Sequence, residues 1–134
     1  MIIKITPDIE KAKSILNIVK SRESFMKQIR KLSYPTIIAE NYYEIMKELC
    51  TAIVLIDGYK AIGENAHKEL IDFMASYKEL NEEEILIMQD LRAKRNKNSY
   101  EGKQIEKSYI ENKEKKLLGI IEKLKKILKK KLEG

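Results

Sequence analysis

The sequence predicts an all-α protein: a bundle of four or five antiparallel helices, up and down in turn, that ends in a long C-terminal helix. Ile, Leu, Lys and Glu dominate its 134 residues, and only 5 Gly and 2 Pro interrupt them. Apolar residues also recur at steps of three and four along most of the chain. An all-β chain would need more turn residues and an alternating pattern. We expect a single helical domain over residues 1–134.

The first predicted helix begins at Thr6-Pro7-Asp8. A hydroxyl cap there precedes a proline at the first helical position and an acid in the first turn. Apolar residues then keep helical spacing to about Leu32. Pro35 ends this helix and opens the next, because proline lacks the N–H that a helix interior needs but suits a first turn.

The second predicted helix carries the cleanest period of the chain. Its apolar residues follow steps of four and three: Ile38, Tyr42, Ile45, Leu49, Ala52 and Ile56. Two further apolar residues widen this stripe into a broad face, so we expect this helix at the centre of the bundle. Asp57, Gly58 and Gly63 weaken helix beyond it. Asn65 then caps a short helix whose first turn holds His67.

Another strong helix start is Asn81, which three glutamates follow. Glu84 is placed to complete a capping box with the asparagine. The apolar spacing of this helix stops after Leu91. A final helix is predicted over roughly residues 105–132, and its Lys-rich end complements the negative end of the helix dipole.

The composition indicates where in the cell the protein is expected, but says little about its function. A net charge of +6 is compatible with a nucleic-acid partner, yet many lysines lie in the last quarter, where they can simply solvate a helix. The single Cys50 excludes an intrachain disulfide, and its apolar helical stripe favours a buried structural thiol. The first residues are charged too soon for a signal peptide, and no apolar run approaches the ~20 residues that span a bilayer. We therefore expect a soluble, cytoplasmic protein without a membrane partner.

The usual catalytic signatures are missing from the sequence. It has no glycine-rich phosphate loop, no CxxC pair and no GxSxG element. A lone histidine also makes a His-rich metal site impossible. We expect neither a metal nor a cofactor.

The best candidate site is the basic segment LRAKRNKNSY at residues 91–100. Its side chains suited to RNA phosphates are Arg92, Lys94, Arg95, Asn96 and Lys97. Its asparagines and serine compete for the backbone, so we expect the segment at a helix end or in the loop beyond. In a continuing helix Arg95 and Tyr100 would point ~140° apart. They share a site only if the helix ends there or a second subunit supplies one of them. The alternative is that the arginines only pair with Glu82–Glu84 or with acids of the tail.

Two stretches resemble the HEPN family, small helical-bundle domains found in prokaryotic toxin–antitoxin pairs and in several RNases. Residues 43–60, followed by His67-Lys68-Glu69-Leu70-Ile71-Asp72-Phe73, look like the long central helix, glycine turn and short H-x-x-L-I helix of archaeal-type members. The basic segment resembles the family's R-N-x-x-x-H motif. The resemblance covers about residues 35–130 and implies a HEPN-like bundle.

Carried over by position, the motif arginine falls on Arg95, the asparagine on Asn96 and the histidine on Tyr100. Active members are metal-independent endoribonucleases, usually dimers whose motifs face each other, so the resemblance implies a homodimer with Arg95 and Tyr100 as catalytic residues. Tyrosine departs from the motif, because a side chain with a pKa of ~10 is a poor base at pH 7. His67 is the one imidazole that could support the reaction.

Several functions stay open at this point. The first is a HEPN ribonuclease toxin that a nucleotidyltransferase-type antitoxin silences. The second is a catalytically inactive module that holds RNA, a nucleotide or that antitoxin through Arg92, Arg95 and Asn96. The third is a purely structural helical dimer. Three tyrosines could stack on bases, although tyrosines on a helical stripe more often belong to the core: Tyr42, Tyr43 and Tyr59.

Overall fold

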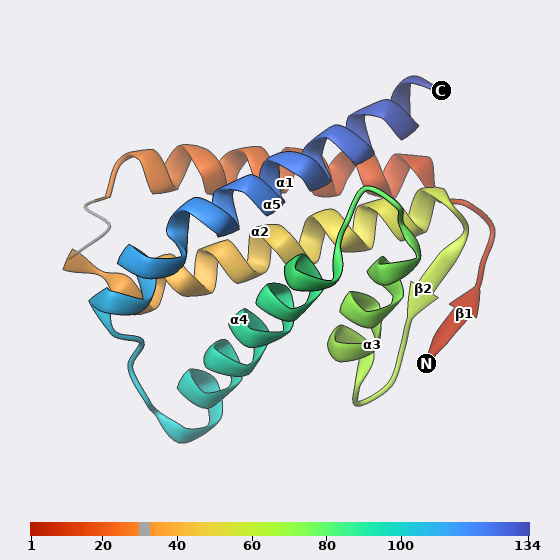
Figure 1. The fold of residues 1–134 in the computed structure, drawn as a ribbon. Coiled ribbons are helices and arrows are strands. Elements are labelled where there is room, and N and C mark those ends of the chain that lie inside the picture. The colour runs from red at the N-terminus through yellow and green to blue at the C-terminus, as the bar shows by residue number, and fades with distance from the viewer. Residues whose placement is uncertain (30–32) are drawn as a thin grey trace.

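The computed structural model describes residues 1–29 and 33–134, and within them it contains five α-helices and a two-stranded sheet (Figure 1). The elements in chain order are β1 (Ile2–Lys4), α1 (Ile9–Lys27), α2 (Pro35–Ile56), β2 (Tyr59–Ala61), α3 (Ala66–Phe73), the 3₁₀ turn η2 (Met74–Ser76), α4 (Glu82–Glu101) and α5 (Lys107–Glu133). The predicted helical bundle is confirmed, and the small sheet is an addition to it.

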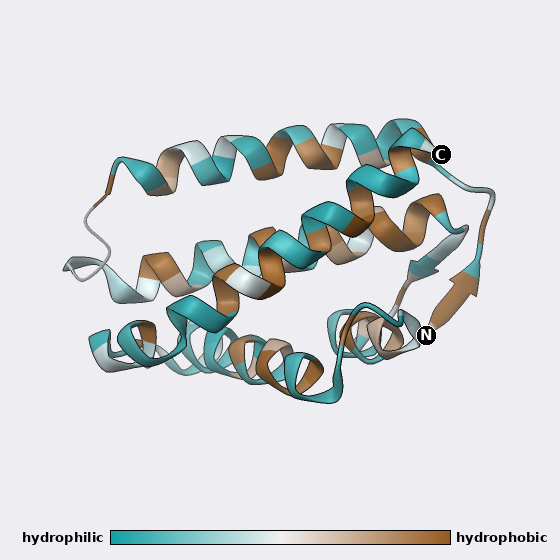
Figure 2. Ribbon diagram, turned by 45° about the horizontal axis from the view of Figure 1, so that its top comes forward, coloured by the Kyte–Doolittle hydropathy of each residue, from teal (hydrophilic) through white to brown (hydrophobic). Residues whose placement is uncertain are grey.

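Helix α2 is the central element, as its broad apolar face predicts. α1 and α5 pack along it, while α3 and α4 contact it from another side. The four long helices alternate in direction along the chain (Figure 1). Hydrophobic and hydrophilic residues alternate along each of them, as expected for helices that bury one face (Figure 2). Twelve of the 22 residues of α2 are buried, so this helix supplies much of the core.

The core confirms the structural interpretation of the lone thiol. Cys50 is fully buried in α2, and burial raises its pKa to about 12. A thiol with this pKa stays protonated and unreactive at neutral pH. In the part of the chain that the structure describes, no helix combines the length and apolar character needed to cross a bilayer.

The helix starts follow the sequence signals with one shift. Asp8, rather than Thr6, caps α1, because its Oδ1 accepts a hydrogen bond from the Lys11 backbone N–H at 3.1 Å. The α1 helix ends at Lys27, and its predicted end at Leu32 lies outside the described residues. α2 begins with Pro35 at its first position, as predicted.

The N-terminal caps of α4 and α3 agree with the prediction in part. The Asn81 side chain accepts from the Glu84 backbone N–H at 2.8 Å, and the Glu84 carboxylate accepts from the Asn81 N–H at 2.9 Å. This is the predicted capping box. Asn65 takes the cap position of α3 but forms no capping hydrogen bond with its side chain.

Helix α4 runs further than the sequence predicts. It continues through the basic segment to Glu101 and stops at Gly102, whose φ of 68° is left-handed. Asn98, expected to compete with the helix, instead donates its amide to the Lys103 carbonyl beyond it at 3.0 Å. The basic segment is therefore helical, and the expectation that it forms a helix end or loop is wrong for its arginines.

The sheet ties the first residues to the connection between α2 and α3. β1 and β2 pair antiparallel, with Ile2 opposite Ala61 and Lys4 opposite Tyr59. Gly58 precedes β2 with a φ of 84°, and a Cβ there would lie 3.0 Å from the Ile5 carbonyl oxygen. Glycine is needed at this close approach. The sheet thereby fixes where α3 begins.

Candidate functional site

The candidate site lies where α2, α3 and α4 meet. Arg95 of α4 is partly buried, and its Nη2 lies 3.4 Å from Oε1 of Glu44 on α2. Its guanidinium carbon stands 5.4 Å from the centre of the Tyr43 ring, within cation–π range. One turn earlier, Arg92 donates from Nε to Oε1 of Gln89 at 2.8 Å. Both arginines are therefore partly buried against neighbouring side chains and keep part of their surface exposed.

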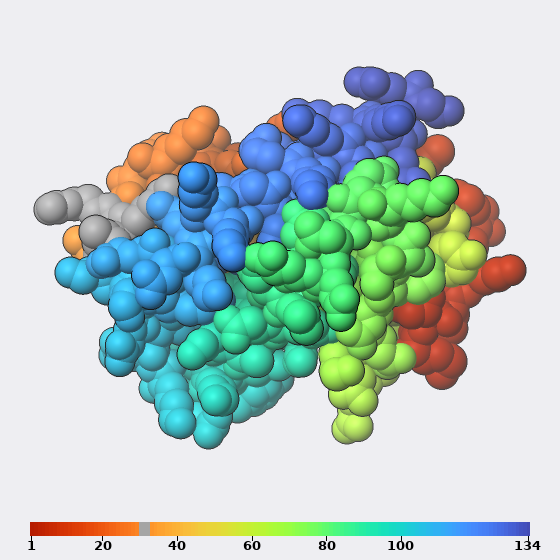
Figure 3. All heavy atoms as spheres, in the orientation of Figure 1, coloured from red at the N-terminus to blue at the C-terminus, as the bar shows by residue number. Residues whose placement is uncertain are grey.

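Gln89 joins this part of α4 to α3. Its Nε2 donates to Oδ1 of Asp72 at 2.8 Å and to the Lys68 carbonyl at 3.0 Å. In the space-filling view the start of α3 and the end of α4 project side by side with a hollow between them (Figure 3). The link through Gln89 holds Arg92 beside the short helix.

Glu44 is shared by two cations. Its Oε2 accepts from Lys47 Nζ at 2.7 Å, while Oε1 holds Arg95 at the longer distance. All three side chains are less than a third exposed, so the charges act in a partly desolvated setting. One carboxylate cannot neutralise two cations, and the group keeps a positive excess.

His67 completes the group from the first turn of α3. Its ring centre lies 6.4 Å from that of Tyr43. Burial, and then the charges of Lys47, Arg95 and Arg92, lower the pKa of this imidazole, while Glu44 opposes them. The lowered pKa keeps His67 neutral at pH 7, so that it can accept a proton. We name Glu44, Lys47, His67, Arg92 and Arg95 the Glu44 cluster.

The Tyr43 ring forms the buried wall of this cluster. Tyr43 is fully buried, and its hydroxyl has no hydrogen-bond partner among the described residues. Burial raises its pKa to about 12, which keeps the phenol neutral. Tyr43 and Tyr42 are both core residues and Tyr59 is only half-buried, so the first two do not present their rings for base stacking.

The structure brings together only some of the predicted site residues. Tyr100 is 82% exposed on a different side of α4 from Arg95, as the ~140° separation in a continuing helix requires. The Lys94 amine stands 5.6 Å from the centre of the Tyr109 ring, and Lys94 and Lys97 both line a separate pocket between α4 and the start of α5. Asn96 is half-buried in α4. The basic segment thus divides between two faces of one helix.

The arginines do not pair as the structural alternative supposes. Glu83 and Glu84 form ion pairs with Lys116 and Lys123 of α5 instead. Arg95 turns to Glu44, a residue that the sequence reasoning did not select. A signal for Glu44 and Lys47 is present in the sequence: polar residues at 44, 47, 48 and 51 recur at helical spacing and form a polar stripe on α2 beside its apolar face.

The cluster offers phosphate-binding cations and one neutral imidazole, but no metal cage. Across residues 1–29 and 33–134, no three His, Cys, Asp or Glu side chains gather in a way that could hold a metal ion. Guanidinium groups beside an imidazole suit a phosphodiester. No protein-family model, curated protein or solved structure matches this chain.

Proposed function

We propose that the chain is a HEPN-type toxin, a homodimer that binds RNA at the Glu44 cluster and cleaves it without a metal ion. The observation that supports this most is the convergence of Arg92, Arg95 and His67. They come from two separate helices, and all three are candidates from the sequence. Arg95 contacts Glu44, and both arginines lie close enough to His67 to lower its pKa. Charge-bearing groups with one perturbed histidine are typical of a functional site.

The arginines would hold the RNA backbone. Guanidinium groups bind phosphate through two parallel N–H bonds, which a lysine cannot do. Arg95 is available for this exchange because its contact with Glu44 is a single, long one of 3.4 Å. A phosphate in front of Arg95 would also face Lys47, since both cations share Glu44. Binding of this kind weakens as salt rises.

Cleavage needs a base for the 2′-hydroxyl and an acid for the leaving oxygen. The neutral imidazole of His67 can take the first proton. Tyr100 can donate a hydrogen bond, but within one chain it lies on a different side of α4 from Arg95. In a homodimer the exposed Tyr100 of one protomer would instead approach Arg95 of the other. The homodimer would thereby bring Arg95 and Tyr100, the first and last residues of the motif, into one site.

A catalytically inactive binding module is the second candidate, and one observation favours it. Tyr100 is 82% exposed and stands where histidine is expected, so a chain that acts as a monomer lacks an acid–base group at that end of the motif. Arg92 and Arg95 would then only hold RNA, a nucleotide or an acidic face of a nucleotidyltransferase-type antitoxin.

The test is RNA cleavage in EDTA by the parent protein and by Arg95→Ala, His67→Gln and Tyr100→Phe. Arg22→Ala is the matched control, because Arg22 also pairs with a glutamate of α2, Glu48. We expect the parent to cleave RNA and Arg95→Ala to lose about 100-fold or more in rate, since it loses a charge beside the phosphate. The control should cleave like the parent.

The outcomes separate the candidates. Binding of RNA that depends on Arg95, without any turnover, supports the inactive module. A folded protein that neither binds nor cleaves RNA rejects the ribonuclease and the RNA-binding form of the module, and leaves the module only a nucleotide or an antitoxin as its partner. Sedimentation of the parent tests the dimer, and a monomer that still cleaves RNA contradicts the shared site.

A further inference from the structure

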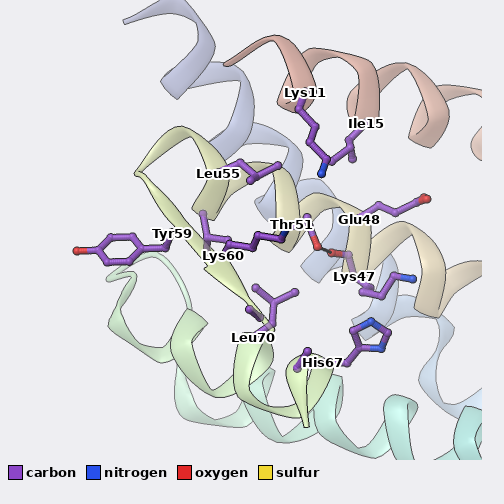
Figure 4. Close-up of a pocket in the computed structure, with 13 residues that line it drawn as sticks. Lys11, Ile15, Lys47, Glu48, Thr51, Leu55, Tyr59, Lys60, His67 and Leu70 are labelled. Atoms are coloured by element: carbon purple, nitrogen blue, oxygen red, sulfur yellow. Dashed lines mark hydrogen bonds between the residues drawn. The ribbon is translucent and has the colours of Figure 1, made fainter. Parts of the chain in front are cut away.

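A second charged region borders the Glu44 cluster. It is a pocket of about 330 Å³ between α1, α2, β2 and α3 (Figure 4). Its apolar walls include Ile15, Leu55 and Leu70. A volume of this size is at the lower end of small-molecule sites. The pocket therefore fits a compact ligand with an apolar part.

Two lysines give this pocket unpaired positive charge. Lys11 comes from α1 and Lys60 from β2, and neither forms an ion pair with any other residue that the structure describes. In Figure 4 the Lys11 amine points down into the pocket, and Lys60 extends across it towards Thr51. Two amines from separate elements thus approach one space, where an anion would relieve their repulsion.

The acid that lines the pocket does not cancel this charge. Glu48 accepts two hydrogen bonds from Arg22, at 2.7 Å from Nε and 3.3 Å from Nη2. Its carboxylate turns away from the amines (Figure 4). Lys47 and His67 line the mouth of the pocket as well, on the side of the Glu44 cluster. The lining therefore has a positive excess after its acid is paired.

We propose that this pocket binds a phosphate monoester, with the phosphate on Lys11 and Lys60 and the organic part against Ile15, Leu55 and Leu70. Its size suits a mononucleotide. The ring of Tyr59 points away from the pocket and packs on Phe73 with 5.1 Å between the ring centres, and His67 lies on the side of the Glu44 cluster, so the organic part mainly contacts aliphatic side chains. The ligand has two natural sources, a free nucleotide or the phosphorylated end of an RNA chain.

The first experiment uses adenosine 5′-monophosphate and adenosine as probes, measured by calorimetry and by amide chemical shifts. We expect the nucleotide to bind with shifts at Thr51, Lys60 and His67, and adenosine to bind at least about tenfold more weakly, because it lacks the charged hydrogen bonds. The double variant Lys11→Ala/Lys60→Ala should lose a similar factor.

Lys4→Ala is the matched control, since Lys4 is exposed on the neighbouring strand and does not line the pocket. It should bind the nucleotide like the parent. The proposal is overturned if the nucleotide does not bind at millimolar concentration, if the double variant binds it equally well, or if the shifts lie elsewhere.

A second pair of probes separates the two sources. A short RNA with a 5′-phosphate that binds the parent more tightly than its 5′-hydroxyl form, with the difference lost in the double variant, identifies the RNA end. Equal binding of both RNAs, with nucleotide binding intact, identifies the free nucleotide. The pocket proposal does not depend on RNA cleavage: a parent that binds the nucleotide but cleaves nothing rejects only the ribonuclease.

Discussion

Tyr42 and Tyr43 are neighbours on α2 and both are buried, yet their hydroxyls end in opposite situations. Tyr42 faces α1 and α5 and donates to Glu114 at 2.7 Å. Tyr43 faces α3 and α4, and its hydroxyl has no partner within the described residues. Buried polar groups in proteins are nearly always paired, so an unpaired hydroxyl is an exception that calls for a structural or functional reason. One side of α2 is therefore built for stability, and the other side tolerates an unsatisfied group.

The two arginine–glutamate pairs on α2 repeat this contrast. Arg22 of α1 makes two hydrogen bonds to Glu48, the shorter at 2.7 Å. Arg95 of α4 makes one contact of 3.4 Å with Glu44, and that carboxylate is shared with Lys47. The first pair is a structural brace. The second holds its cation loosely enough for a ligand to take it.

The largest effect should come from the packed side of α2. Ile45 is 1% exposed between α1 and α5, so Ile45→Ala leaves a cavity and should lower the free energy of unfolding by about 2 to 5 kcal/mol. Ile18→Ala is the matched control, because Ile18 is 47% exposed on α1. Urea denaturation measures both, and equal losses would mean that this side is not a packed core.

Removal of Arg22 should lower the free energy of unfolding more than removal of Arg95, because Arg22 makes the shorter and more numerous hydrogen bonds. Arg22→Ala should cost about 1 kcal/mol, because it leaves the partly buried Glu48 without two charged hydrogen bonds. Arg95→Ala should cost clearly less, since Glu44 keeps Lys47. Thermal and urea unfolding of both variants check the order, and the reverse order would refute the contrast.

The tyrosine comparison can be tested by removing each hydroxyl. Tyr42→Phe should lose about 1 kcal/mol, because a buried hydrogen bond to a carboxylate disappears. Tyr43→Phe should be neutral or slightly stabilising, since the hydroxyl it removes has no partner in the described structure. The two phenylalanine variants are controls for each other. A larger loss at Tyr43 would reveal a hydrogen bond in solution.

The smallest effect concerns pH. The pKa of His67 is lowered from the ordinary 6.5 in the folded protein, so the unfolded chain binds the proton more readily. This part of the stability is present above pH 6.5 and is lost as pH falls below it. Unfolding free energies at pH 5 to 8 should therefore fall more steeply in acid for the parent than for His67→Gln. Parallel curves would show that the pKa of His67 is not lowered in the folded protein.

Much of the fold could be predicted from local signals. The proline at the start of α2 and the Asn81 capping box act within one turn, and the apolar period of α2 repeats along a single helix, so all three appear in the sequence directly. The strands could not be predicted, because three residues are too few to show alternation and their pairing joins residues far apart in the chain. The end of α4 differs from the prediction because the weak helix preference of the asparagines does not stop the helix, which continues until Gly102 ends it in a left-handed conformation.

The site could be predicted only in part for the same reason. Arg92 and Arg95 are conspicuous in sequence, and His67 is conspicuous as the lone imidazole. Their meeting with Glu44 depends on how α3 and α4 pack against α2, which is a tertiary property. The continuous helix also separates Tyr100 from Arg95, a geometry that the segment's composition did not indicate.

The short sheet has a consequence for local opening. β1 and β2 hold only three residues each, and a pair this small is marginal by itself. The amino group of Met1 adds a contact to Glu69 of α3, so release of β1 would loosen β2 and α3 together. We expect the backbone amides of α3 to exchange with deuterium well before those of α2. His67 and Lys60 would then belong to a part of the molecule that opens locally while the core around α2 stays folded.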